Sequence, residues 1–165
     1  MPPRSTLKQP PLRQPLEKGG QETDALALGA QGLLCRIEFW VEGSRQLAPL
    51  RFFVDSGASY SYLNKSQAIE HGIAIPGREM ETVRRTLTAS GPATSTFRVG
   101  RLRGWWHAGL AGHPMDWPVM IRMDDPPGAP PLLGLGGVVR VCRWVIDGTL
   151  TPAEPFGVLT MEDLR

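Results

Sequence analysis

The sequence predicts a mostly β protein with one or two short helices, and three observations lead to this fold class. Apolar and polar residues alternate over residues 35–42, which is the period of a half-buried strand. Two further segments, 82–87 and 94–99, are rich in β-branched residues, which favour strands. The 165 residues include 19 glycines and 16 prolines, and this content favours many turns and short strands over long helices.

Length and composition limit the classes of protein to which this chain can belong. With 165 residues, of which 41% are hydrophobic, the chain is long enough for one domain with a core. The net charge of +2, with scattered basic residues, gives no reason to expect nucleic acid or a membrane surface as a partner. No run of roughly 18 apolar residues predicts a transmembrane helix, and the N-terminus lacks the apolar region of a secretion signal. We therefore expect a cytoplasmic location by default, with Cys35 and Cys142 as buried free thiols.

The predicted organisation is one domain between two tails. Residues 1–30 contain five prolines and then Gly19-Gly20, so we expect a flexible Pro-rich N-terminal tail. The domain is expected to span residues 31–150, and residues 151–165 are expected to form a C-terminal tail. An alternative use of the first segment is as a proline-rich ligand, although its proline spacing is not distinctive.

The expected elements follow from local signals. The first strand ends at a turn over residues 42–45, and a more apolar strand over residues 50–54 runs directly into Asp55. Asn64, with Gln67 three residues later, predicts a capping box and a helix of about two turns that Gly72 ends. Residues 82–87 and 94–99 predict a hairpin whose turn is residues 88–92. Residues 117–123 and 143–147 predict further strands, the second of them the last, with a Pro/Gly loop and Leu132-Leu133-Gly134 between them.

The strongest chemical signal is an apolar strand that ends in Asp55-Ser56-Gly57-Ala58-Ser59. A buried strand delivers the carboxylate of Asp55 to a fixed place, and Gly57 permits a tight turn. Ser56 adds a hydroxyl that can brace the loop, and Ala58 is small enough for a second copy of the loop to approach. Two carboxylates a few ångströms apart share a proton, so that together they supply an acid and a base. As a bare tripeptide, Asp-Ser-Gly is usually only a turn. The flanking residues argue for the catalytic interpretation.

Those flanking residues resemble a known family. Phe53-Val54-Asp55-Ser56-Gly57-Ala58-Ser59 resembles the active-site loop of retropepsins and their bacterial relatives. Pro131-Leu132-Leu133-Gly134 resembles the apolar-apolar-Gly element that lies behind this loop in the family. Thr88-Ala89-Ser90-Gly91-Pro92 falls where the family has its flap. Trp117-Pro118-Val119-Met120 falls at the next core strand, and Arg143-Trp144-Val145-Ile146-Asp147 resembles the closing strand of bacterial members. The resemblance covers roughly residues 32–148.

The resemblance implies a retropepsin-like closed acid-protease β-barrel and an aspartic endopeptidase without a cofactor. It implies a catalytic Asp55, a flap at Ala89, Ser90 and Gly91, and support of the active-site loop by Leu133 and Gly134. The implied partners are a second copy of the chain and a peptide or protein substrate. The single Asp-Ser-Gly motif implies a homodimer, since Asp147 is followed directly by Gly148 and has the wrong order for a second motif.

The chain departs from the family pattern at one pair of positions. Bacterial relatives usually continue the apolar-apolar-Gly element with Arg-Asp, and this sequence has Leu135 and Gly136. In retroviral members the Arg pairs with an Asp whose position here is Ser59, so both ends of the ion pair are missing together. Loss of both partners strands no charge. The departure motivates the alternative that the chain is a catalytically inactive dimeric peptide-binding or scaffolding module.

Two other groups of residues suggest alternative roles. His107 and His113 with Asp116 suggest a metal-dependent hydrolase as a third interpretation, but their spacing matches no common metal-binding pattern, and no metal is expected. Trp105, Trp106 and Trp117 are expected in the core or in a dimer contact, with a place in a substrate cleft as the alternative for one of them.

Overall fold

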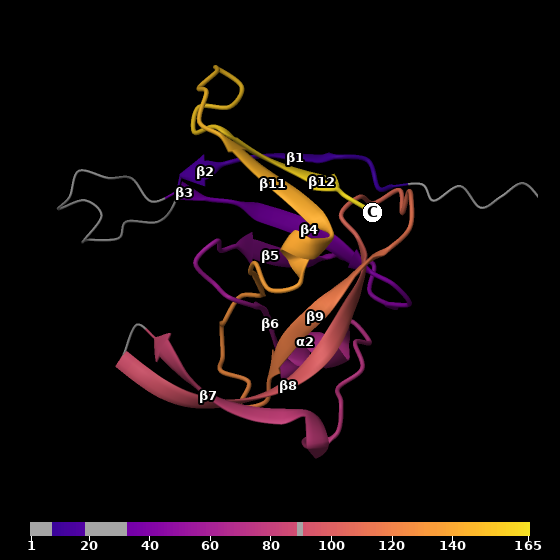
Figure 1. Ribbon diagram of the computed structural model, residues 1–165, viewed down its shortest axis with the longest axis vertical. Coiled ribbons are helices and arrows are strands. Elements are labelled where there is room, and N and C mark those ends of the chain that lie inside the picture. Colours follow the sequence, from indigo (N-terminus) through magenta and orange to yellow (C-terminus); the bar gives the residue numbers. More distant parts are fainter. Residues whose placement is uncertain (1–7, 19–32, 89–90) are drawn as a thin grey trace, which may run out of the picture.

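A computed structural model describes residues 8–18, 33–88 and 91–165 (Figure 1). Strands dominate it, and the helical elements are short. The elements are β1 Leu12–Pro15, β2 Glu17–Lys18, β3 Leu33–Leu34, β4 Arg36–Val41, β5 Leu50–Val54, β6 Ser61–Asn64, α2 Lys65–Glu70, η1 Arg78–Met80, β7 Glu81–Thr88, β8 Gly91–Trp105, β9 Met115–Arg122, β10 Leu132–Leu133, η2 Val138–Arg140, β11 Cys142–Asp147 and β12 Val158–Asp163.

A seven-stranded sheet forms the body of the molecule. Its order is β4-β5-β10-β6-β9-β8-β7, and a further pairing between β4 and β8 closes it into a barrel. Closure is possible because the long strand β8 pairs with β7 and β9 and, near Trp105, with β4. A Cβ atom on Gly104 would lie 2.0 Å from the carbonyl oxygen of Trp40, so only glycine permits this close approach. The predicted mostly β fold with a closed barrel is confirmed.

The core consists of the inward-facing residues of these strands. Alternation along β4 and β5 buries Ile37, Phe39 and Phe52 completely. The sequence predicted this half-buried pattern for β4, whereas β5 was expected to be more buried than it is, since its Arg51 is exposed. The ring of Phe39 lies 5.1 Å from that of Trp117, edge to face. Trp106 and Trp117 are buried, so the prediction that they belong to the core is confirmed. Cys35 and Cys142 are buried free thiols, also as predicted.

Helix α2 begins and ends as its sequence predicts. The backbone N–H of Asn64 donates to Oε1 of Gln67 at 2.8 Å, and the two residues form a capping box. Gly72 has a φ of 68°, the left-handed conformation that ends helices, and it follows the C-cap residue. The apolar segment after Gly137 is the single turn η2.

The structure corrects the expectation of two tails. Residues 151–165 contain β12, which pairs with β11 and β1 in a three-stranded sheet, order β1-β12-β11, and so β11 is not the last strand. Val158, Leu159 and Met161 are buried, and Leu159 and Met161 belong to the same hydrophobic cluster as the barrel strands. Residues 8–18 of the expected N-terminal tail supply β1 and β2, while the rest of residues 1–30 lie outside the described residues. The folded unit therefore includes both ends of the described chain.

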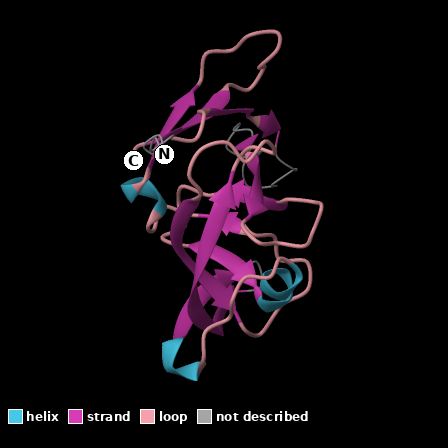
Figure 2. Ribbon diagram, turned by 90° about the vertical axis from the view of Figure 1, so that its right-hand side faces the viewer, coloured by secondary structure: helices cyan, strands magenta, loops and turns pink. Residues whose placement is uncertain are grey.

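The two ends of the molecule carry different features. The loop of the β11–β12 hairpin projects at one end, and η1 lies at the opposite end beside the start of β7 (Figures 1 and 2). None of the helices in the described residues is long and apolar enough to cross a membrane.

Candidate active site

Strand β5, which leads into Asp55, is an interior strand of the seven-stranded sheet. Its neighbours are β4 on one side and β10 on the other. The backbone N–H of Val54 donates to the carbonyl of Cys35 at 2.9 Å, and that of Asp55 donates to the carbonyl of Leu133 at 3.0 Å. Because neighbouring strands hold this backbone on both sides, the exposed side chain of Asp55 extends from a fixed backbone position.

The loop after β5 folds back on the same aspartate. The N–H of Gly57 donates to Oδ1 of Asp55 at 2.9 Å, and the N–H of Ala58 donates to the carbonyl of Asp55 at 3.1 Å. A side chain at position 57 would crowd the carboxylate, since a Cβ there would lie 3.2 Å from Oδ1. The turn thus orients the Asp55 carboxylate through a backbone donor and leaves its second oxygen open.

The Leu132-Leu133-Gly134 element lies directly behind this loop. Leu132 and Leu133 form β10, which is parallel to β5 and antiparallel to β6. The N–H of Gly134 donates to Oγ of the buried Ser61 at 3.2 Å, and the N–H of Leu135 donates to the carbonyl of Ala58 at 3.0 Å. A Cβ on Gly134 would lie 2.1 Å from the carbonyl oxygen of Tyr60, so the contact requires glycine.

Gly136, at one of the two positions that depart from the family pattern, contacts the active-site loop closely. A Cβ at this position would lie 2.3 Å from the carbonyl oxygen of Ser59, so the backbone at 136 packs against the backbone of the active-site loop. No side chain fits between them. The backbone at Gly136 therefore lies directly against the active-site loop.

A cleft of about 700 Å³ opens in front of the loop, and we call it the Asp55 cleft. Its volume is within the range of ligand-binding sites. Four elements of the barrel contribute side chains to it: Tyr62 from β6, Arg85 from β7, Phe97 from β8 and Arg122 from β9. The rings of Tyr62 and Phe97 contact each other with centroids 5.6 Å apart. The cleft therefore combines one carboxylate with an aromatic wall and two arginines.

The charges in the cleft are unevenly paired. Arg122 lies 3.2 Å from a carboxylate oxygen of Asp124 and donates to Oγ of Ser95 at 2.6 Å. Arg85 has no carboxylate within ion-pair distance among the described residues.

Burial raises the pKa of the Tyr62 hydroxyl, and the nearby Arg84 partly opposes that rise. At neutral pH Tyr62 is therefore a neutral hydrogen-bonding group.

The structure brings together most of the residues that the sequence singled out. Asp55, Gly57, Ala58 and Ser59 line the cleft. Of the predicted flap, Ala89 and Ser90 lie outside the described residues, and Gly91 begins β8 opposite Thr88. Strand β7 of the same hairpin contributes Arg85 to the cleft, so the hairpin borders the site.

The sequence did not predict several of the residues that line the cleft. Tyr62, Phe97 and Arg122 reach the cleft only because β6, β8 and β9 lie side by side in the barrel. The alternation in each strand predicts which residues share one face of that strand, but it does not predict which other strand lies beside it.

The alternative metal site does not form among the described residues. No group of three or more His, Cys, Asp or Glu side chains there is arranged to hold an ion. His107 instead lies with its Nε2 atom 3.0 Å from the carbonyl oxygen of Pro10, and Asp116 pairs with Arg101 at 2.7 Å.

Comparison with known proteins supports the fold through structure and not through sequence. No family model matches the chain, and no curated protein matches its sequence. Among solved structures, a retropepsin-like aspartic protease from Rickettsia conorii is similar, with a TM-score of 0.52 and 17% identity. The match covers 92% of this chain and 98% of that chain. The chain has a retropepsin-like fold. At this identity the likeness concerns the fold alone, and the activity is argued from the site.

Proposed function

We propose that the chain is an aspartic endopeptidase that acts as a homodimer. The observation that carries the proposal is the geometry of Asp55. Its carboxylate is exposed at the end of strand β5, is oriented by the N–H of Gly57, and lines a cleft of about 700 Å³. The retropepsin-like fold of the neighbour from Rickettsia conorii supports the same interpretation.

The chemistry needs a second carboxylate. In the proposed dimer the Asp55 carboxylates of two copies approach each other and share one proton. One carboxylate takes a proton from water, and the other donates a hydrogen bond or a proton to the scissile carbonyl oxygen. Water attacks the carbonyl carbon and the amine leaves with a proton, so the reaction proceeds without a covalent intermediate.

The described surface offers an edge for the second copy. Strand β11 is an edge strand of the three-stranded sheet, with no strand beyond it among the described residues. Val145 is 36% exposed and Ile146 is 62% exposed on this strand. An exposed edge with apolar side chains favours pairing with another chain. Strand β11 follows Leu135 and η2, so the chain connects this edge directly to the active-site support.

A substrate peptide would bind in extended form. The hairpin of β7 and β8 borders the cleft and would add main-chain hydrogen bonds to the peptide, as in strand addition. The ring of Tyr62, which packs against the buried Phe97, provides an apolar contact for a substrate side chain. No cofactor is needed for this reaction.

The proposal is tested by peptide cleavage with Asp55→Asn. Purified protein is incubated with a mixed peptide library between about pH 4 and 7, the range in which paired carboxylates act. The wild type is expected to cleave, whereas Asp55→Asn lowers kcat by about a hundredfold or more, because an amide is neither the acid nor the base. An aspartic-protease transition-state mimic should block the wild-type turnover.

Asp125→Asn is the matched control. Asp125 is also a loop aspartate, and its Oδ1 atom accepts hydrogen bonds from Ser66, which an asparagine oxygen can equally accept. This variant should keep wild-type turnover. Equal cleavage by the wild type and Asp55→Asn would refute the proposal. A folded dimer that cleaves nothing would favour the peptide-binding or scaffolding alternative.

A further inference from the structure

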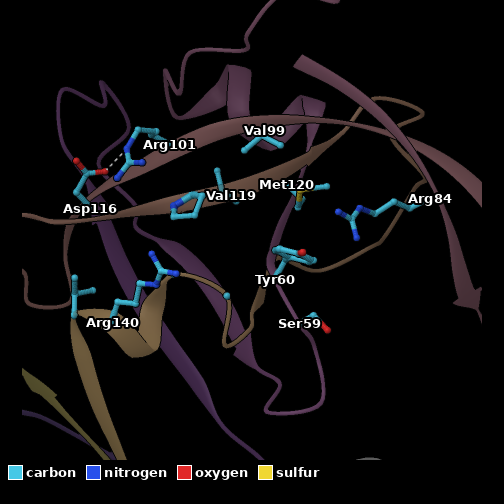
Figure 3. Close-up of a pocket in the computed structure, with 13 residues that line it drawn as sticks. Ser59, Tyr60, Arg84, Val99, Arg101, Asp116, Val119, Met120 and Arg140 are labelled. Atoms are coloured by element: carbon cyan, nitrogen blue, oxygen red, sulfur yellow. Dashed lines mark hydrogen bonds and ion pairs between the residues drawn. The ribbon is translucent and has the colours of Figure 1, made fainter. Parts of the chain in front are cut away.

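A second cavity adjoins the Asp55 cleft, and we call it the arginine cavity after Arg84, Arg101 and Arg140 in its lining (Figure 3). Its volume is about 710 Å³, similar to that of the cleft. Ser59 lines both cavities, and Tyr60 continues into the wall of the second one. The two cavities therefore meet at Ser59.

The floor of the arginine cavity is apolar. Val99, Pro118, Val119 and Met120 come from the adjacent strands β8 and β9. Val119 is 1% exposed and Met120 is 3% exposed, so these side chains are held in the packed body of the barrel. The floor is thus preformed, and a ligand does not have to order it.

The rim of the cavity has an excess of positive charge. Arg84 comes from β7, Arg101 from β8 and Arg140 from η2. Figure 3 shows Arg84 and Arg140 on opposite sides, with Tyr60 between them, and Arg101 beside Asp116. Among the described residues of the lining, Asp116 is the only carboxylate, and Arg103 shares it at 3.7 Å.

Two of these arginines have no carboxylate of their own. Within the described part of the chain, neither Arg84 nor Arg140 has one within ion-pair distance. Arg84 instead stacks over the ring of Tyr60, with its guanidinium carbon 4.8 Å from the ring centroid. Stacking leaves the edges of a guanidinium group free to donate hydrogen bonds.

We propose that the arginine cavity binds an acidic side chain of the substrate, at a position away from the scissile bond. This inference rests on the proposed function, since it assigns a substrate preference to the same site. Guanidinium groups bind carboxylates through paired N–H donors, and the apolar floor suits the neighbouring side chains of such a residue. An extended peptide advances about 3.3–3.6 Å per residue, so moving the acidic residue stepwise along the substrate locates the position that this cavity would hold.

The test compares matched peptides. Starting from a cleaved sequence, one residue is set to Glu or to Gln and moved stepwise outward from the scissile bond on either side. At an outer position the wild type should prefer Glu in kcat/KM. Arg140→Gln and Arg84→Gln should each reduce that preference by about two- to fivefold, the usual strength of a partly exposed ion pair. The double variant should lose it, and added salt should weaken it in the wild type.

Arg51→Gln is the matched control. Arg51 has a side chain 73% exposed, lies in β5 outside the arginine cavity and pairs with Glu38. It should leave the Glu preference unchanged. If the wild type shows no Glu preference at any outer position, or Arg140→Gln and Arg84→Gln both keep it, the inference is wrong while the proposed function stands.

A binding measurement distinguishes failure of the proposed protease function from failure of the proposed site for an acidic side chain. If the wild type cleaves no peptide, the proposed function fails, and fluorescence anisotropy with labelled Glu and Gln peptides tests the cavity alone. Tighter binding of the Glu peptide to Asp55→Asn, lost in Asp55→Asn with Arg140→Gln, supports the acidic site. Equal binding of both peptides overturns it. A second result would also overturn it: inorganic phosphate competes with peptide binding only when Arg140 is present, and the protein shows no preference for Glu over Gln. The cavity would then be a site for a free anion.

Discussion

At the scale of single residues, backbone contacts hold the loop around Asp55. Gly134 and Gly136 each lie where a Cβ would meet a carbonyl oxygen of the loop, at 2.1 Å and 2.3 Å respectively. The loop motif and the Leu-Leu-Gly element were predictable because both are short, local patterns. The structural meaning of Gly136 was not, since it depends on how closely two segments far apart in the sequence approach each other.

The contact at Gly134 leads to a stability prediction. Gly134→Ala should lower the free energy of unfolding by about 1–3 kcal/mol, because the added methyl group forces the active-site loop to move. The measurement is urea denaturation of both proteins. Gly148→Ala is the matched control, because a Cβ at Gly148 meets no atom within 4 Å and its φ is not in the left-handed range. A loss at Gly134 no larger than that at Gly148 would show that the loop does not depend on this contact.

At the scale of elements, the barrel strands were predictable and the terminal strands were not. Strands β4, β5, β7 and β9 show alternation or β-branched runs in the sequence itself. Strand β1 contains one leucine and a proline, and it pairs with β12 about as far away as the chain allows, Leu12 opposite Met161. No local pattern encodes such a pairing, and so both segments resembled tails.

The terminal segments are tied together through Asp163. Its side chain has no exposed surface, and it accepts hydrogen bonds from the backbone N–H of Gln9 at 2.9 Å and from the Arg165 side chain at 2.8 Å. Gln9 in turn donates to the carbonyl oxygens of Gly104 and His113. One carboxylate thus joins both ends of the described chain to the barrel.

The pKa of Asp163 predicts how this connection depends on pH. Burial alone would raise the pKa, but the hydrogen bonds from Arg165 and Gln9 outweigh it and hold the pKa below its usual value. A carboxyl group with a lowered folded-state pKa stabilises the fold above its unfolded pKa of about 3.9, and this stability is lost as the pH falls through the folded pKa.

Asp163→Asn should therefore destabilise the protein by about 1–3 kcal/mol at pH 7, and by progressively less below about pH 4. Thermal or urea unfolding of both proteins across this pH range measures the difference. Asp147→Asn is the control, because Asp147 is exposed and bonds only to Thr149 within the described hydrogen-bond network. A penalty at Asp163 that stays constant from pH 7 to pH 3 would contradict the assignment.

At the scale of the whole molecule, the retropepsin-like barrel was predictable from two short motifs and their order. The cleft was not, because its walls come from strands that are neighbours only after folding. The site described in one chain is half of the proposed active centre, with one carboxylate. The proposed mechanism requires that a second copy completes this site.

Mixing wild-type protein with Asp55→Asn tests that claim most directly. Turnover is measured at a fixed wild-type concentration, at a level where dimers predominate, after equilibration with an equal amount of the variant. If each active site needs Asp55 from two chains, half of the wild-type chains pair with an inactive copy and turnover falls to about half. Turnover that stays unchanged after exchange would show that each chain acts alone, and would contradict the paired-carboxylate mechanism.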